Sequence, residues 1–166
     1  MENMQNPEEK WEGKVCARLT RATADQIWPL FKDFFNLHKW FPGLAICHGI
    51  HGANGEPGCI RYCAGFSISS ATAAAAAETR WSKEKLISVD ESGRSLSYEM
   101  VDSNIGFKSY VSMIKVNPGD GDQDGCVIEW RITVDPVEGW TLDDFVRKYE
   151  VGLQTMAKTM EDALLP

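Results

Sequence analysis

The sequence lacks the patterns of several common protein classes. It contains no apolar run of membrane-spanning length, and its first residues, MENMQNPEEKWEGK, contain no apolar stretch like that of a secretory signal. Lysine and arginine number 17 against 24 aspartate and glutamate residues, which gives a net charge of -7 without a basic cluster. We therefore expect a cytoplasmic protein with no membrane insertion and no nucleic-acid partner.

Cysteine is present, but not in the spacing of a metal site. The five cysteines form no CxxC pair, and no histidine and cysteine share the spacing of zinc ligands. Cys59 and Cys63 lie four residues apart on one predicted strand, where they share a face without disulfide geometry. We expect free thiols in a reducing compartment, and neither a metal nor a cofactor.

Apolar periodicity predicts one α+β domain over residues 11–166, after a disordered tail over residues 1–10. A strand comes first, and a helical stretch follows that a capping box at Thr23 opens. Pro29 within it predicts either a kink or a short helix followed by another. About six antiparallel strands come next, and a long amphipathic helix capped at Thr141 closes the chain. A curved sheet around that helix fits this order, because no other helix is long enough to cover the sheet, and such a fold tends to enclose a cavity.

Strand alternation directs one carboxylate toward the interior. In RWSKEKL, Lys83 and Lys85 share a face, and we expect that face to meet solvent because two lysines are hard to bury. By alternation, Ser82 and Glu84 then point inward. A buried carboxylate needs a partner or a raised pKa.

Alternation leaves the direction of Arg61 undecided. Cys59 and Cys63 share its face, which favours burial, whereas Ile60 and Tyr62 favour burial of the other face. If Arg61 faces inward, it and Glu84 could bind a polar ligand group by charge-assisted hydrogen bonds, or move a proton. If it faces outward, it forms a surface ion pair or lies at the edge of the sheet.

Several other side chains are candidates for the cavity wall. Tyr110 offers an O–H group, either to a ligand or to solvent at the rim. His38 lies near the expected mouth, as a ligand contact or as packing, and Trp130 shares the apolar face of its strand. Phe145 and Tyr149 belong to the core face of the last helix. The expected ligand-binding residues are Trp130, Cys63, Ser82, His38, Phe145 and Tyr149.

Longer stretches of the sequence resemble a known family. FKDFFNLHKWFPGLAICHGIHGANGEPGCIRYCAG (residues 31–65), WSKEKLISVD (residues 81–90), LSYEM and GFKSY are similar to the plant lachrymatory-factor-synthase family. That family belongs to the Bet v 1/START-like superfamily, also called the SRPBCC or polyketide cyclase/dehydrase and lipid-transport proteins. The resemblance runs from Trp11 into the C-terminal helix. It implies a helix-grip fold with an internal cavity for a small hydrophobic molecule.

The resemblance also implies roles for three residues. In that family, an arginine in GC-x-RY and a glutamate in KEKL are the proposed catalytic pair, assisted by a tyrosine on a later strand. These positions are Arg61, Glu84 and Tyr110 here. The family reaction rearranges a small alkenyl sulfenic acid to a thial S-oxide without a cofactor. Arg61 and Tyr110 would hold the oxygen as charge develops, and Glu84 would shuttle the proton.

One segment departs from the family. Between Gly65 and Trp81 the chain is longer and carries five alanines, Ala73 to Ala77, which would alter the volume or the mouth of the cavity. The superfamily also contains many binding and transport proteins, so the same fold hosts different functions. Two hypotheses remain: a cofactor-independent isomerase or cyclase, and a non-catalytic carrier or sensor of small molecules. The sequence identifies no protein partner.

Overall fold

The computed structural model describes residues 9–41, 43–65, 79–119 and 125–166. The chain begins with β1 (Trp11–Leu19), α1 (Ala24–Lys32) and a short 3-10 helix, η1 (Phe34–Lys39). The elements that follow are β2 (Ile46–His51), β3 (Ile60–Ala64), β4 (Trp81–Asp90), β5 (Ser95–Ser103), β6 (Val111–Pro118), β7 (Cys126–Val134) and α3 (Leu142–Leu164). The predictions for residues 1–8 and for the alanine run 73–77 lie outside the described residues.

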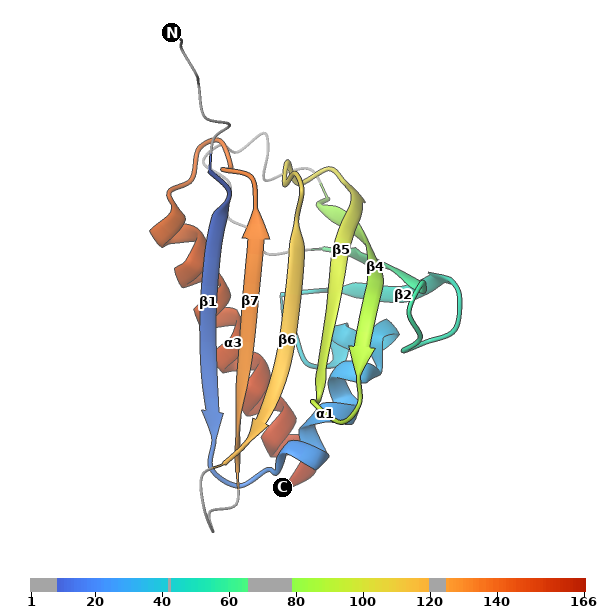
Figure 1. Cartoon of the computed structure of the whole chain (residues 1–166), viewed down its shortest axis with the longest axis vertical. Coiled ribbons are helices and arrows are strands. Elements are labelled where there is room, and N and C mark those ends of the chain that lie inside the picture. The colour runs from blue at the N-terminus through green and yellow to red at the C-terminus, as the bar shows by residue number, and fades with distance from the viewer. Residues whose placement is uncertain (1–8, 42, 66–78, 120–124) are drawn as a thin grey trace, which may run out of the picture.

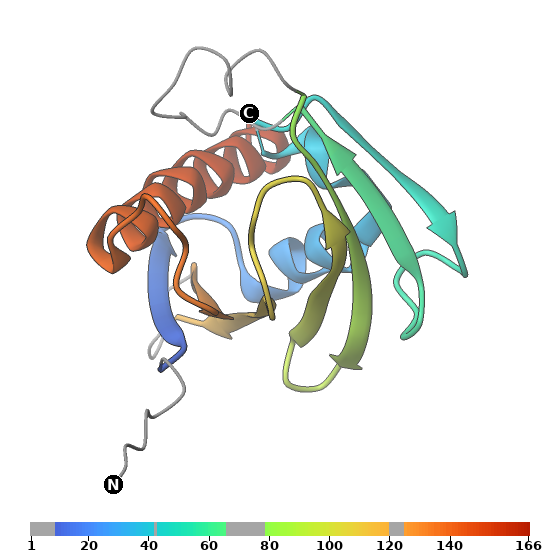
Figure 2. The same ribbon diagram turned by 90° about the horizontal axis from the view of Figure 1, so that it is seen from above.

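The strands form one antiparallel sheet that curves around the helices. Its seven strands have the order β1-β7-β6-β5-β4-β3-β2, so each strand from β2 to β7 lies beside its neighbour in sequence, and β1 closes on β7. The long helix α3 lies across the concave side, with α1 beside it (Figure 1), and the view along the sheet shows the strands wrapping around them (Figure 2). The predicted α+β helix-grip fold is confirmed.

Local sequence signals set the helix ends. The Thr23 hydroxyl accepts the backbone N–H of Gln26, and the Gln26 side chain accepts the backbone N–H of Thr23, which is a complete capping box. Pro29 lies inside α1, and the chain continues as a second short helix, η1. Thr141 caps α3 by accepting the N–H of Asp144 at 3.1 Å. The two expected short helices and the cap at Thr141 are confirmed, but Pro29 lies within the first helix, which ends at Lys32, and does not separate it from η1.

The core lies between the concave face of the sheet and the helices. Alternate residues of β7, from Cys126 to Val134, are buried, and they face the buried side of α3 that includes Phe145, Leu153 and Met160. This burial of apolar area is the main force that holds the helix in the sheet. Within the described ranges, no helix is both long and apolar enough to cross a membrane.

The glycine-rich turn between β2 and β3 fixes the position of η1. Gly55 has a positive φ of 82°, and a Cβ there would lie 2.7 Å from the Lys32 carbonyl oxygen, so glycine permits the turn to pack against the end of α1. Asn54 then accepts the N–H of Phe35 and donates to the Asp33 carboxylate. These contacts hold the start of η1 beside β2, with Phe34 against Arg61 of β3.

Candidate functional site

A buried ion pair joins the third and fourth strands. Arg61 on β3 and Glu84 on β4 are directly opposite each other in the register. Arg61 Nε donates to Glu84 Oε1 at 2.8 Å, and Arg61 Nη2 lies 2.7 Å from the same oxygen. The two residues are only 3% and 6% exposed. The inward direction of Glu84 is confirmed, and the undecided direction of Arg61 is resolved as inward.

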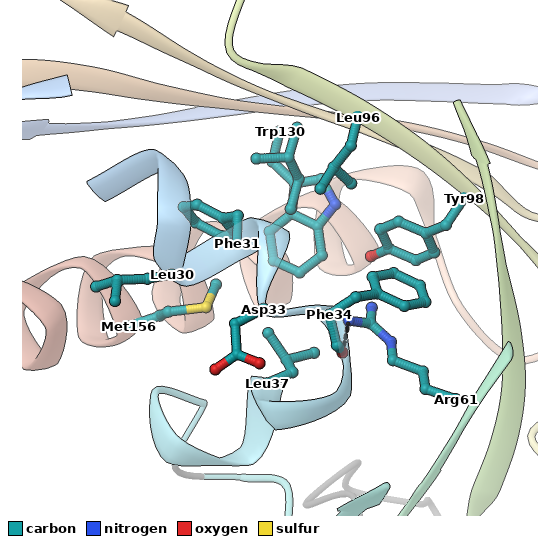
Figure 3. Close-up of a pocket in the computed structure, with 11 residues that line it drawn as sticks. Leu30, Phe31, Asp33, Phe34, Leu37, Arg61, Leu96, Tyr98, Trp130 and Met156 are labelled. Atoms are coloured by element: carbon teal, nitrogen blue, oxygen red, sulfur yellow. Dashed lines mark hydrogen bonds between the residues drawn. The ribbon is translucent and has the colours of Figure 1, made fainter. Parts of the chain in front are cut away.

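The guanidinium of Arg61 is enclosed by aromatic rings and by the backbone of η1. Its carbon lies 3.8 Å from the ring centroid of Phe34 and 4.8 Å from that of Tyr98, both at cation–π distance. Arg61 Nη1 also donates to the Phe34 carbonyl oxygen at 2.9 Å, as the dashed line in Figure 3 shows. The glycine-rich turn therefore acts on the ion pair indirectly, because it holds the residue that carries this carbonyl.

The second oxygen of the carboxylate also has a partner. Ser82 Oγ donates to Glu84 Oε2 at 3.1 Å, and Cys63 Sγ lies 4.0 Å from Glu84 Oε1. Both side chains were expected among the ligand-binding residues, and the structure brings them to the carboxylate. Burial alone would lower the pKa of Arg61, but the Glu84 carboxylate raises the pKa of that guanidinium above its usual value. Arg61 is therefore a permanent cation inside the domain.

Tyrosines extend from the ion pair toward α3. The ring of Tyr98 on β5, which contacts Arg61, lies 6.3 Å from the ring of Tyr110, the residue just before β6. The Tyr149 hydroxyl on α3 donates to the Tyr110 hydroxyl at 2.9 Å. Tyr98 thus lies between Arg61 and Tyr110.

Burial controls the protonation of these three hydroxyls. Removal from water raises the pKa of Tyr98, Tyr110 and Tyr149 well above the ordinary value, because the phenolate would be poorly solvated. The three side chains therefore remain neutral hydrogen-bond donors at physiological pH. A neutral donor beside a fixed cation suits an oxygen atom that carries or develops negative charge.

The interior contains a small cavity that Arg61 and Tyr98 line, whereas Glu84, Tyr110 and Tyr149 are not among its lining residues. Its volume is about 10 Å³, which is room for about one water molecule. Figure 3 shows Arg61, Tyr98 and Trp130 around it, with Phe34 and Leu37 of η1 on one side. Trp130 Nε1 is buried, and it has no hydrogen-bond partner among the described residues. A buried donor without a partner is costly, and a ligand oxygen would satisfy it.

The remaining predicted contacts lie at different distances from this cavity. Phe145 packs in an aromatic group with Tyr149, at 5.0 Å between ring centroids. His38 lies on η1 and does not line the cavity; its Nδ1 is buried and has no hydrogen-bond partner among the described residues. The structure therefore joins Arg61, Glu84, Ser82 and Cys63 in one group and Tyr110, Tyr149, Phe145 and Trp130 in a second.

Sequence reasoning missed Phe34, Tyr98 and Cys47. Phe34 and Tyr98 contact Arg61 only because η1 and β5 converge on it, and no local pattern gives that convergence. Cys47 pairs with Cys63 across the β2–β3 hairpin. Here a signal existed, because both cysteines lie eight residues from Gly55 in the predicted turn.

The seven-stranded sheet around a long C-terminal helix, with a polar group buried in its interior, defines this chain as a helix-grip protein. Residues 17–161 match the family model for polyketide cyclase / dehydrase and lipid transport, and the chain belongs to that family.

Solved structures share the same fold. Major latex-like protein 151 from Panax ginseng superposes with a TM-score of 0.69 at 20% identity, over 94% of this chain and 99% of that protein. The protein XoxI from Bacillus cereus gives a TM-score of 0.68 at 18% identity, over 93% of this chain and 95% of the other. A putative uncharacterized protein from Bacillus thuringiensis gives a TM-score of 0.68 at 17% identity, over 93% of this chain and 99% of that protein. At these identities the likeness shows the fold.

Proposed function

We propose that this protein binds a small, mostly apolar molecule with a polar head and moves a proton on it. The observation that carries the proposal is the buried pair of Arg61 and Glu84 beside neutral tyrosine hydroxyls. A buried ion pair adds little to stability, because the cost of removing two charges from water offsets their attraction. Perturbed ionisable groups in an interior cavity are typical of functional sites.

The proposal gives each group a task. The ligand oxygen would lie against the Arg61 guanidinium and the Tyr98 O–H group, which line the cavity, while the Tyr110 ring lies 6.3 Å beyond that of Tyr98. Both would stabilise negative charge that develops on this oxygen during the reaction. Glu84 would take a proton from the ligand and return it at another atom, which amounts to an isomerisation or cyclisation without a cofactor.

Ligand entry requires the interior to open. A cavity of about 10 Å³ is far smaller than the roughly 300 to 1,000 Å³ of ordinary ligand pockets. The wall formed by Leu37 and Phe34 belongs to a six-residue 3-10 helix, which is the shortest helix in the described part of the chain. We infer that η1 moves away from β3, which also releases the Phe34 carbonyl from Arg61 and frees a guanidinium donor for the ligand.

The resemblance to the lachrymatory-factor-synthase family supports small sulfenic acids as the first substrates to test, and the family description supports reactive carbonyl compounds as the second. Turnover should be compared between the wild type and Glu84→Gln, with Glu12→Gln as a control, because Glu12 is an exposed carboxylate on β1. The proposal predicts that Glu84→Gln loses turnover and that Glu12→Gln keeps it. Equal turnover in both variants would refute proton transfer by Glu84.

One observation favours a carrier as the second candidate. Both carboxylate oxygens of Glu84 already accept hydrogen bonds, from Arg61 and from Ser82, as in an anchor that holds the guanidinium in place. In a carrier, Glu84 would orient Arg61, and Arg61 would bind the head group. The two candidates separate in one assay, because a carrier retains the ligand unchanged, whereas an enzyme releases an isomer. The cytoplasmic location remains a prediction from composition.

A further inference from the structure

Two thiols face each other beside the ion pair. Cys47 on β2 and Cys63 on β3 are register partners, and their sulfur atoms lie 3.7 Å apart, with the Cys63 S–H directed at Cys47 Sγ. On its other side, Cys63 Sγ lies 4.0 Å from Glu84 Oε1. The pair is not required by the proposed ligand chemistry, so its arrangement calls for a separate explanation.

The hydrogen-bond pattern of the sheet places the two thiols in disulfide range. The Leu86 N–H bonds to the Cys59 carbonyl oxygen, so Cys59 directs its backbone toward β4. Cys59 directly precedes β3, and Gly65, just after β3, donates its N–H to the Arg80 carbonyl oxygen, so Cys63 between them also directs its backbone toward β4. Its pairing with Cys47 on β2 is therefore a non-hydrogen-bonded one, where Cα atoms are about 4.5 Å apart. That separation lies within the range that disulfides span.

The two sulfurs differ in reactivity. Cys47 is 7% exposed and lies on β2, an edge strand, whereas Cys63 has no exposed surface. The hydrogen bond from Cys63 outweighs burial and, with the nearby Arg61 guanidinium, lowers the pKa of the Cys47 thiol to about 6. The same hydrogen bond, burial and the Glu84 carboxylate raise the pKa of Cys63. Cys47 is thus the thiolate that attacks an oxidant, and Cys63 is the resolving thiol.

We propose that Cys47 and Cys63 form a redox-active dithiol whose oxidation by a hydroperoxide links β2 to β3 beside the Arg61–Glu84 pair. The Cys47 thiolate attacks the terminal oxygen of the hydroperoxide, the O–O bond breaks, and the departing alkoxide or hydroxide is protonated to alcohol or water. The Cys63 sulfur then attacks Cys47 Sγ, and the S–O bond of the sulfenic acid breaks. The hydroxide released takes the Cys63 proton, so two thiols are oxidised and one peroxide is reduced.

Disulfide formation changes the neighbouring site directly. The two sulfurs must approach each other, because a disulfide bond is about 2 Å long, whereas they are now 3.7 Å apart, and any movement of Cys63 Sγ toward β2 takes it away from Glu84 Oε1. Glu84 also loses the only S–H group that lies near it among the described residues. Closure of the loop between positions 47 and 63 stabilises the hairpin, and we expect Tm to rise by about 5 to 10 °C.

The test exposes the reduced full-length protein to hydrogen peroxide and follows its intact mass. The expected product is lighter by about 2 Da, returns to the starting mass with dithiothreitol, and yields a peptide linking Cys47 to Cys63. Cys16→Ser is the matched control, since Cys16 is an exposed thiol on β1. This variant should form the same Cys47–Cys63 disulfide as the wild type. A disulfide that involves Cys16, or stepwise oxygen addition without a link, would overturn the proposal.

Two further variants separate the roles of the thiols. In Cys63→Ser the sulfenic acid on Cys47 has no thiol to resolve it, so a dimedone adduct should accumulate there. Cys47→Ser should give no adduct at Cys63, because the buried thiol does not start the reaction. If either serine variant fails to fold, the alanine variants serve the same purpose. Equal dimedone labelling at both positions would contradict the assigned order. None of these readouts depends on ligand binding, so they stand apart from the proposed function.

Discussion

Polar groups are buried in two regions of the interior, and the two regions stabilise them differently. The ion-pair region consists of Arg61, Glu84, Ser82 and the Phe34 carbonyl, and it contains full charges that satisfy each other. The tyrosine region consists of Tyr98, Tyr110, Tyr149 and Trp130, and it contains only neutral groups. The cavity lies where the two regions meet.

This difference indicates that the tyrosine region contributes mainly to stability and the ion-pair region mainly to binding. The tyrosine region buries large rings around α3, which stabilises the fold through apolar area. The ion-pair region gains little net stability from its charges, yet hydrogen bonds hold its charged side chains in defined positions. The fold can therefore depend on one region while the chemistry depends on the other.

Removal of one charge should have the largest effect. Glu84→Gln leaves the Arg61 guanidinium buried without its counter-ion, and we expect a loss of about 3 to 5 kcal/mol in the free energy of unfolding. Urea denaturation measures this. The double variant Arg61→Met/Glu84→Leu removes both charges in a similar volume and should stay within about 1 kcal/mol of the wild type, or exceed it. Equal losses in the single and double variants would mean that the pair itself stabilises the fold.

Alkaline pH should destabilise the tyrosine region next most strongly. The pKa values of Tyr98, Tyr110 and Tyr149 are raised in the folded state, so the folded protein holds protons that the unfolded chain releases above its ordinary tyrosine pKa of about 10. Stability is therefore fully present below that pH and falls as pH rises above it. Absorbance titration should show these three phenols ionising only as the protein unfolds. Their ionisation in the folded state near pH 10 would contradict the burial argument.

Loss of a single hydroxyl should cost less. Tyr149→Phe removes the donor to the Tyr110 hydroxyl and keeps the ring that packs on Trp130, so we expect a loss of about 0.5 to 1.5 kcal/mol. Tyr62→Phe is the matched control, because Tyr62 lies on the outer face of β3 and stacks on Trp81. Thermal unfolding of both variants checks this. A loss as large as that of Glu84→Gln would remove the distinction between the two regions.

The smallest effect on stability should come from the turn that positions η1. Asn54→Ala removes the acceptor of the Phe35 N–H and the donor to Asp33 at the surface, with an expected loss of about 1 kcal/mol or less. Because η1 is then held less firmly over Arg61, we expect faster ligand association. Stopped-flow fluorescence measures the association rate. An unchanged rate would show that η1 does not control entry.

Most of the fold followed from local patterns in the sequence. The capping box at Thr23, the alternation of β7 and the apolar face of α3 each predict an element that the structure contains. These signals are strong because they depend on residues close in sequence. The placement of η1 on β3 depends on contacts of Asn54 with Asp33 and Phe35, which no periodicity reveals.

The site was predictable only in part. Alternation identified Glu84 because two lysines occupied the opposite face, but it left Arg61 undecided. The reason is that Tyr62 on the outer face of β3 is covered by the rings of His48 and Trp81, so that face also looks apolar in sequence. Tyr98 was missed because its contact with Arg61 crosses from β5 to β3, and only the curvature of the sheet brings the two together.

The central claim is that the ion pair serves binding of a polar head group rather than stability. Two fluorescent molecules test it, because 8-anilinonaphthalene-1-sulfonate and N-phenyl-1-naphthylamine share their rings and differ in the anionic head. Fluorescence titration should show that the wild type prefers the sulfonate by about tenfold or more, the value of a charge-assisted hydrogen bond. Arg61→Met/Glu84→Leu should fold and bind both molecules equally. A sulfonate preference that persists in this double variant would contradict the account.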